Sequence, residues 1–311
     1  MNTPHISVLK EEAINGLNIK QDGIYVDMTL GYGGHSKEIL KKLNKKGFLF
    51  AFDKDIDACN YSNDLFKNDF TNYKIFNTSF TNMKNKLERL NITKVDGILY
   101  DLGISSPEID QASRGFSYMK DAKLDMRMDQ NAKLSAYEVV NDYSENDLVR
   151  IFRQYGEEKH ALKIAKMICE ERKEKPITTT FELVDIISKA YPYREKRNGH
   201  PAKKVFQAIR IEVNNELEEL TKSLNQALEM LNINGRVAVI TFHSLEDRIV
   251  KQLFNKYTEI DPFVKGLPNV DKSLLPDYKL ITKKGIIPNS NEILKNKRSA
   301  SAKLRIIERI K

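Results

Sequence analysis

Several features that would point directly to a function are scarce or missing in this sequence of 311 residues. Its two cysteines, Cys59 and Cys169, lie far apart and match no metal-ligand or redox spacing, so we expect reduced thiols and no zinc or other metal site. No apolar run is as long as a membrane span, and the first residues lack the basic start and hydrophobic segment of a signal peptide. These absences predict a cytoplasmic protein that does not engage a membrane. No internal repeat or low-complexity segment is found.

What the sequence does contain is the composition of a globular protein with an excess of positive charge. Hydrophobic residues make up 41% of the chain, and 51 lysines and arginines outnumber 43 acidic residues to give a formal net charge of +8. An excess of this sign often accompanies a polyanionic partner, although many basic proteins bind no nucleic acid. The C-terminal basic run, Lys295 to Lys311, concentrates the charge and is interpreted as a tail that lies along RNA phosphates.

A glycine-rich turn is the most informative stretch. A β-prone run ends at Asp27, Gly31, Gly33 and Gly34 follow, and Ser36 is predicted to cap the next helix. The spacing is neither the G-x-G-x-x-G of dinucleotide sites nor the Gly-Lys-Ser/Thr of a phosphate loop. The turn therefore favours a ligand with a ribose and a carboxylate, such as S-adenosylmethionine, over a triphosphate. The alternative is a turn that only connects a strand to a helix.

Acidic residues end two further predicted strands. Asp53 directly follows the apolar run Phe48 to Phe52, at the place where Rossmann-like folds hydrogen-bond ribose hydroxyls. Asp101 lies near the end of the predicted strand Val95 to Leu102 and opens a loop that contains Ser105. The carboxyl ends of parallel strands meet at one edge of the sheet, so we expect Asp53, Asp101 and Ser105 to face the same crevice as the glycine turn. Acceptors there would orient an exocyclic amine for methylation.

The alternation of strands and helices stops after the fourth strand. Residues 109–211 are mostly helix-patterned, and the strand Arg236 to Phe242 then resumes the sheet. We predict an α/β fold: a Rossmann-like sheet from residues 1–108 and 212–311, with a helical substrate-recognition domain, 109–211, inserted between strands four and five. His243 follows the fifth strand and is a candidate for contacting a substrate base or taking its proton; capping the following helix is the alternative.

Basic residues of the inserted segment suggest RNA contacts. Arg114 and Arg127 lie in stretches that mix arginine, aromatic residues and glycine, a combination that suits stacking on bases and pairing with phosphates. Lys203 and Lys204 directly precede the predicted helix Val205 to Leu217, and Arg210 lies within it, so the start of the helix is basic, against the preference of the helix dipole for acids. A solvated surface turn is the alternative.

Seven segments, taken together and in order, resemble those of the bacterial 16S rRNA (cytosine-N4)-methyltransferases along almost the whole chain. They are HISVL at 5–9, GYGGHS at 31–36, DLGISSP at 101–107, RGFS at 114–117, DMRMD at 125–129, FQAIR at 206–210 and FHSLEDR at 242–248. The resemblance implies a Rossmann-like methyltransferase that modifies a decoding-centre (P-site) cytidine with S-adenosylmethionine. It also implies that the cofactor is bound by Gly33, Gly34, His35, Asp53, Phe80, Asp101 and residue 108.

The sequence departs from the family's Ser-Ser-Pro-Gln pattern at Glu108. A glutamate keeps the acceptor of glutamine but lacks its amide donor, so a contact there would differ. Phe80 reads as a core residue by pattern alone, and only the resemblance makes it a cofactor contact.

The candidate residues fall into three groups. Asp101, Ser105 and His243 are candidates for the chemistry, with no general base assigned. Gly33, Gly34, His35, Asp53, Phe80, Asp101 and Glu108 are expected to bind S-adenosylmethionine. The RNA candidates are Arg114, Arg127, Lys203, Lys204, Arg210, Arg298, Lys303 and Arg305.

Two other function classes are weighed against the enzyme. A non-catalytic RNA-binding factor of ribosome assembly would use the same fold and the same 16S rRNA partner within the small subunit. A nicotinamide dehydrogenase is disfavoured because the glycine spacing departs from the dinucleotide pattern. The sequence leaves open whether the chain acts as a monomer or a homodimer.

Overall fold

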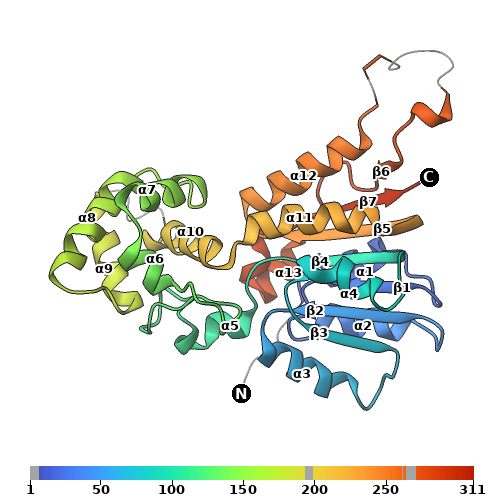
Figure 1. The fold of residues 1–311 in the computed structure, drawn as a ribbon, viewed down its shortest axis with the longest axis horizontal. Coiled ribbons are helices and arrows are strands. Elements are labelled where there is room, and N and C mark those ends of the chain that lie inside the picture. The colour runs from blue at the N-terminus through green and yellow to red at the C-terminus, as the bar shows by residue number, and fades with distance from the viewer. Residues whose placement is uncertain (1–6, 193–198, 261, 264–270) are drawn as a thin grey trace. The chain divides into compact units, whose positions relative to one another are not determined.

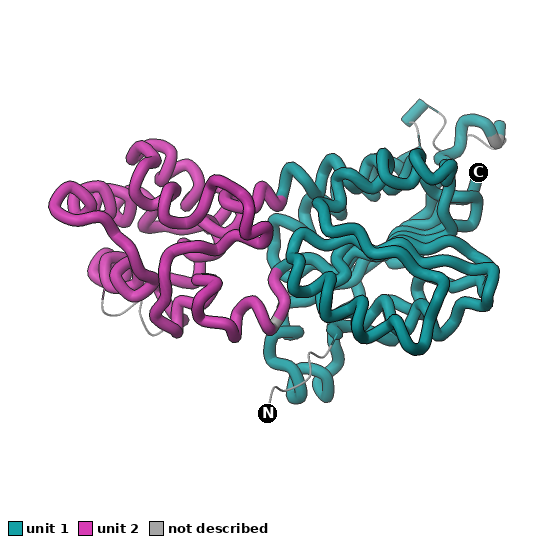
Figure 2. Tube along the Cα trace, turned by 60° about the horizontal axis from the view of Figure 1, so that its bottom comes forward, with its two compact units in different colours: residues 1–103, 217–311 teal, residues 104–216 magenta. Residues whose placement is uncertain are grey.

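The computed structural model describes residues 7–192, 199–260, 262–263 and 271–311, so His5 and Ile6 of the first family-like segment lie outside it. The chain forms two compact units, unit 1 from residues 1–103 and 217–311 and unit 2 from residues 104–216 (Figure 2). Unit 2 extends beyond the expected insertion of residues 109–211 at both ends. Among the described residues, no helix is both long enough and apolar enough to cross a bilayer.

The described part of unit 1 contains a seven-stranded sheet in the order β3-β2-β1-β4-β5-β7-β6 (Figure 1). Strands β1 to β5 pair in parallel, whereas β7 runs antiparallel to both of its neighbours. The strands are β1 (Ile24–Asp27), β2 (Phe48–Asp53), β3 (Tyr73–Asn77), β4 (Val95–Asp101), β5 (Leu231–Thr241), β6 (Tyr278–Leu280) and β7 (Lys303–Arg309). The order reverses between β1 and β4, which is where open α/β sheets bind their ligands.

Helices cover both faces of this sheet. Because successive strand residues point to opposite faces, Val26 packs in one core and Tyr25 in the other. The first core includes side chains of α4 (Met83–Glu88), α11 (Glu216–Glu229) and α12 (Ser244–Thr258). The second includes side chains of α1 (Lys10–Gly16), α2 (Gly34–Lys42) and α3 (Ile56–Phe66). The remaining elements of unit 1 are η1 (Phe80–Asn82), η4 (Lys272–Leu274), α13 (Ser290–Lys295) and η5 (Lys297–Ser301).

Unit 2 is helical and has its own hydrophobic core. In the described part of this unit the elements are α5 (Ser106–Asp110), η2 (Ala112–Arg114), α6 (Ala136–Asp142), α7 (Glu145–Gln154), α8 (Ala161–Glu174), α9 (Thr180–Ala190) and α10 (Ala202–Asn214). The predicted Rossmann-like sheet with a helical insertion between strands four and five is therefore confirmed.

Three local predictions were wrong. Helix α2 begins at Gly34 with Gly33 as its N-cap, so Ser36 is no cap and instead donates a hydrogen bond to Asp27. The predicted helix Val205 to Leu217 is broken at Asn215, which adopts a left-handed conformation that asparagine tolerates. The C-terminal basic run is not a tail, because residues 303–309 form β7 between β5 and β6.

Candidate functional site

The glycine turn is shaped by crowding as well as by backbone conformation. Gly33 has φ of 75°, and a Cβ there would lie 2.7 Å from the ring of Phe66. A Cβ on Gly34 would lie 1.9 Å from Oγ of Ser7. Neither position can therefore carry a side chain without displacing Phe66 or Ser7. The first turn of α2 follows directly, and the backbone N–H groups of a helix start are a common place for a ligand to bind.

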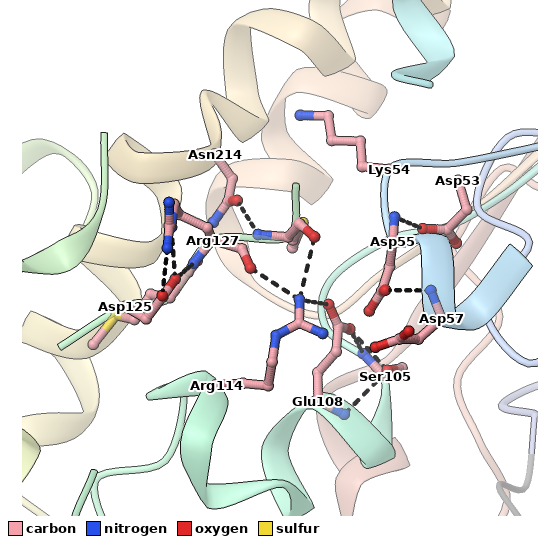
Figure 3. Close-up of polar contacts among 12 residues, drawn as sticks. Asp53, Lys54, Asp55, Asp57, Ser105, Glu108, Arg114, Asp125, Arg127 and Asn214 are labelled. Atoms are coloured by element: carbon pink, nitrogen blue, oxygen red, sulfur yellow. Dashed lines mark hydrogen bonds and ion pairs between the residues drawn. The ribbon is translucent and has the colours of Figure 1, made fainter. Parts of the chain in front are cut away.

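Asp53 ties the end of β2 to this turn. Its Oδ2 accepts from the Gly31 N–H at 2.7 Å, and its Oδ1 accepts from the Asp55 N–H at 2.9 Å (Figure 3). Burial raises the pKa of Asp53 to about 6, although both backbone N–H groups lower it. A carboxylate oxygen has more than one lone pair, so these bonds leave acceptor capacity for a ribose hydroxyl. Asp55 is the N-cap of α3 and accepts from Asp57 N at 2.9 Å.

Asp27 supports the turn from the end of β1 without being exposed itself. It accepts from the Ser36 hydroxyl at 2.7 Å and from the Thr29 N–H at 3.1 Å, and it is 1% exposed. Burial raises its pKa to about 6, while the two hydrogen bonds lower it. Sequence reasoning placed Asp27 at the strand end but did not include it among the site residues.

This burial predicts a pH-dependent stability. The pKa of Asp27 is about 6 in the native state against 3.8 for the free side chain, so the native state holds its proton more tightly and loses that stabilisation as the pH rises through 6. Asp27→Asn carries no such proton. The free energy of unfolding of Asp27→Asn minus that of the wild type should therefore rise by about 2 kcal/mol between roughly pH 4 and 7, as measured by urea titrations.

The exposed Asp22, in the segment before β1, provides the control. Asp22→Asn should show no such trend relative to the wild type. A flat difference curve for Asp27→Asn would contradict the prediction.

His35 and Asp101 form a pair at the carboxyl ends of the central strands. His35 is 5% exposed, with Nδ1 3.4 Å from Asp101 Oδ2 and Nε2 3.2 Å from the Val8 carbonyl oxygen. Since a carbonyl only accepts, Nε2 carries a hydrogen. Burial, and then the like charges of Asp27 and Glu246, raises the pKa of Asp101 well above its usual range.

Asp101 also has an oxygen that the chain leaves unused. Its Oδ1 is buried and has no hydrogen-bond partner among the residues that the structure describes. Buried acceptors of this kind are costly unless something pairs with them, so this atom marks a position for an N–H or O–H group of a ligand.

Phe80 opens η1, directly after the β3 end of the sheet. Its ring lies edge-on to Tyr100 with centroids 5.8 Å apart, and the Tyr100 hydroxyl lies 2.6 Å from the Ser223 hydroxyl. The packing role suggested by pattern is thus observed. Because Phe80 is only half-buried, the cofactor contact expected from the resemblance stays a prediction.

Comparison with known proteins shows which family the chain belongs to. Residues 2–310 match the MraW methylase family. The chain belongs to the MraW methylase family. It is 53% identical over 310 residues to ribosomal RNA small subunit methyltransferase H of Clostridium botulinum (strain Loch Maree / Type A3), with full coverage of both chains. It is 50% identical over 310 residues to the protein of the same name from Lactiplantibacillus plantarum, with 99% and 97% coverage. The family membership suggested by the seven segments is therefore confirmed.

In this MraW-family chain, Ser105 and Glu108 form the start of α5. Ser105 Oγ accepts from the Glu108 N–H at 3.3 Å, and Glu108 Oε2 accepts from the Ser105 N–H at 2.7 Å (Figure 3). This is a capping box, in which glutamate and glutamine serve equally. The departure from the family's usual glutamine therefore keeps the helix start. The other carboxylate oxygen of Glu108 lies 4.0 Å from Arg114 Nη2.

The three arginines of unit 2 proposed as RNA contacts are engaged inside the unit. Arg114 is 6% exposed and donates to the carbonyl oxygens of Arg127 and Met128, so little of its side chain is available to RNA and its RNA contact stays a prediction. Arg127 makes a two-point ion pair with Asp125. Arg210 does the same with Glu216, at 2.7 and 2.8 Å. Arg127 and Arg210 would have to give up these pairs before contacting RNA.

The two lysines of α10 are the more accessible candidates. Lys203 and Lys204 are both exposed in its first turn, and Lys204 Nζ donates to the Glu157 carbonyl oxygen at 2.8 Å. Their RNA contact stays a prediction.

Residues near the end of β5 are also committed to internal contacts. His243 is the N-cap of α12, and its Nδ1 accepts from the Glu246 N–H. Its buried Nε2 lies 3.1 Å from Glu246 Oε1 but makes no hydrogen bond to any residue that the structure describes. The capping alternative for His243 is thus observed. Asp247 accepts from both Lys303 and Arg305, and these hydrogen bonds hold its pKa low although burial opposes them. Arg298 is exposed on η5.

Sequence reasoning missed the residues that hold the backbone of unit 2 in place. Asn214 is buried; its Oδ1 accepts from the Met128 N–H at 2.8 Å, and its Nδ2 donates to the Met126 carbonyl oxygen at 2.8 Å (Figure 3). An asparagine near the end of a helix resembles many surface residues in sequence. No local signal could have identified these partners, which lie more than 80 residues away.

Proposed function

We propose that this chain transfers a methyl group from S-adenosylmethionine to the N4 amine of a decoding-centre (P-site) cytidine in 16S rRNA of the small ribosomal subunit. The observation that carries the proposal is the unused, buried Oδ1 of Asp101 beside the glycine turn. The full-length identity to small subunit rRNA methyltransferases supports the choice of substrate.

The residues at the edge of the sheet fit the cofactor. Gly33 and Gly34 let the backbone turn tightly against Phe66 and Ser7, Asp53 has acceptor capacity for a ribose, and Phe80 offers a half-buried ring. His35, in the first turn of α2, is proposed to line the cofactor site together with these residues. When bound, S-adenosylmethionine supplies an electrophilic methyl group on a sulfonium centre.

The protein's own contribution is to bind and orient. Asp101 Oδ1 accepts a hydrogen bond from an amine, which fits both the amino group of the methionine portion and the cytosine amine. A hydrogen bond from the amine to Asp101 orients the lone pair of the amine nitrogen. Because the amine is already positioned, the entropy cost of bringing it to the methyl group contributes less to the barrier of the transfer step. By family resemblance, Glu108 is proposed as a further cofactor contact and Ser105 as a substrate contact, although the capping box already uses both side chains.

The proposal is tested with the full chain, labelled S-adenosylmethionine and small-subunit particles that lack the modification. We expect N4-methylcytidine in the digested rRNA. RNA binding without any methyl transfer by the wild-type protein would favour the assembly-factor alternative and would contradict the enzyme.

A further inference from the structure

A basic pocket opens at the carboxyl end of β5, within unit 1. Its walls come from the end of β5, the first two turns of α12 and the junction between η5 and β7. The polar side chains that matter here are Ser244, Asp247, Arg248, Lys251, Ser301 and Lys303. The cofactor site described above uses none of them.

Helix α12 presents four of these groups as one stripe. Residues 244, 247, 248 and 251 are three or four positions apart, so their side chains share a helix face. Ser244, Arg248 and Lys251 are exposed. Lys251 forms no ion pair with any residue that the structure describes, so its ammonium group is available to a ligand.

The residues that line the pocket include more basic than acidic side chains. Asp247, the only carboxylate among the lining residues, lies 2.8 Å from Lys303 Nζ and 2.6 Å from Arg305 Nε. Three cations, Arg248, Lys251 and Lys303, thus line the pocket with one carboxylate, and Arg305 pairs with that carboxylate from outside the lining. The exposed hydroxyls of Ser244 and Ser301 add hydrogen-bond donors.

We propose that this pocket binds a phosphodiester group of the RNA substrate, with Arg248 and Lys251 as its main cationic contacts. Cations combined with hydroxyl donors are the groups that proteins use to hold backbone phosphates and so to fix the register of a nucleic acid. The inference rests on the proposed function, because it takes RNA as the substrate. In this proposal the RNA phosphate binds in the pocket at the end of β5, and not along an extended C-terminal tail.

The test compares Lys251→Gln and the double variant Arg248→Gln/Lys251→Gln with Lys256→Gln. Lys256 is an exposed lysine in the last turn of the same helix, so the control makes the same change of charge outside the pocket. Binding of a 16S rRNA transcript is measured by filter retention over a series of salt concentrations. Methylation of small-subunit particles gives KM and kcat separately.

We expect the double variant to weaken RNA binding about tenfold at low salt and to reduce the slope of log affinity against log salt by about one. KM for the particles should rise while kcat stays at the wild-type value. Lysine acetylation footprinting should show RNA protecting Lys251 but not Lys256. Thermal melting and cofactor affinity report whether each variant is folded. If the double variant does not fold, the RNA affinity and salt dependence of Lys251→Gln test the proposed phosphate contact.

Pocket variants that behave like Lys256→Gln in affinity, salt slope and footprint would overturn the inference. RNA binding is measured independently of methyl transfer, so the proposed phosphate site and the proposed enzymatic function can fail separately. If the pocket variants weaken RNA binding but the wild-type protein transfers no methyl group, only the proposed enzymatic function is refuted. Protection of Lys251 by an acidic polypeptide but not by RNA would assign the pocket to a protein partner.

Discussion

Replacing Asp101 with alanine should lower the rate of methyl transfer by two to three orders of magnitude, roughly the effect of removing one preorganised polar contact from a reacting centre. The substitution removes the unused acceptor Oδ1 and also the partner of His35 Nδ1. RNA affinity should be unchanged, because Asp101 carries no positive charge. Single-turnover methylation of small-subunit particles, together with filter binding, measures both quantities.

Asp96 supplies the matched control for this experiment. It lies near the opposite end of the same strand, β4, where it pairs with Lys20 and accepts from the Ile24 N–H. Asp96→Ala should cost some stability but keep the wild-type rate per folded molecule. Asp101→Asn separates charge from hydrogen bonding, since it retains an acceptor. Transfer by Asp101→Ala within about threefold of the wild type would contradict a direct role.

The parts of the fold that follow from local signals could be predicted from the sequence. The buried run Phe48 to Phe52 has the continuous apolar pattern of a parallel strand, and the glycines after β1 determine where the chain can turn. Acids at the ends of β2 and β4 then lie at the same edge of the sheet, because parallel strands end there, with β1 between the two strands. The placement of Asp53 and Asp101 in unit 1 therefore needed no long-range information beyond the strand pattern.

Partners that depend on distant residues could not be predicted. Arg305 is basic in sequence, yet the structure pairs it with Asp247, 58 residues earlier, because β7 inserts beside β5. Arg114 contacts backbone carbonyl oxygens, which leave no mark in the sequence. A positive charge count therefore overestimates the surface available to RNA. Among the arginine and lysine candidates for RNA contacts, the exposed Lys203 and Lys204 are therefore favoured over Arg127, Arg210, Lys303 and Arg305, which form close ion pairs.

Replacing Gly115 with alanine should destabilise unit 2 by about 3 kcal/mol, which combines the cost of a positive φ with that of overpacking. Gly115 has φ of 71°, and its Cβ would lie 2.5 Å from the Lys123 carbonyl oxygen and 2.9 Å from the Asp125 N. Both atoms belong to the backbone, so neither can rotate away. The added methyl group would push apart two segments that the bond from Met126 N to the Arg114 carbonyl oxygen, 3.0 Å long, now joins.

Gly31→Ala separates the two costs. Gly31 also has a positive φ, of 49°, but its Cβ would have no atom closer than 3.9 Å, so this variant should lose only about 1 kcal/mol. Thermal melting followed by circular dichroism ranks the two variants, and hydrogen exchange should locate the loss for Gly115→Ala in residues 104–216. Equal melting temperatures would mean that the segment 123–126 moves freely.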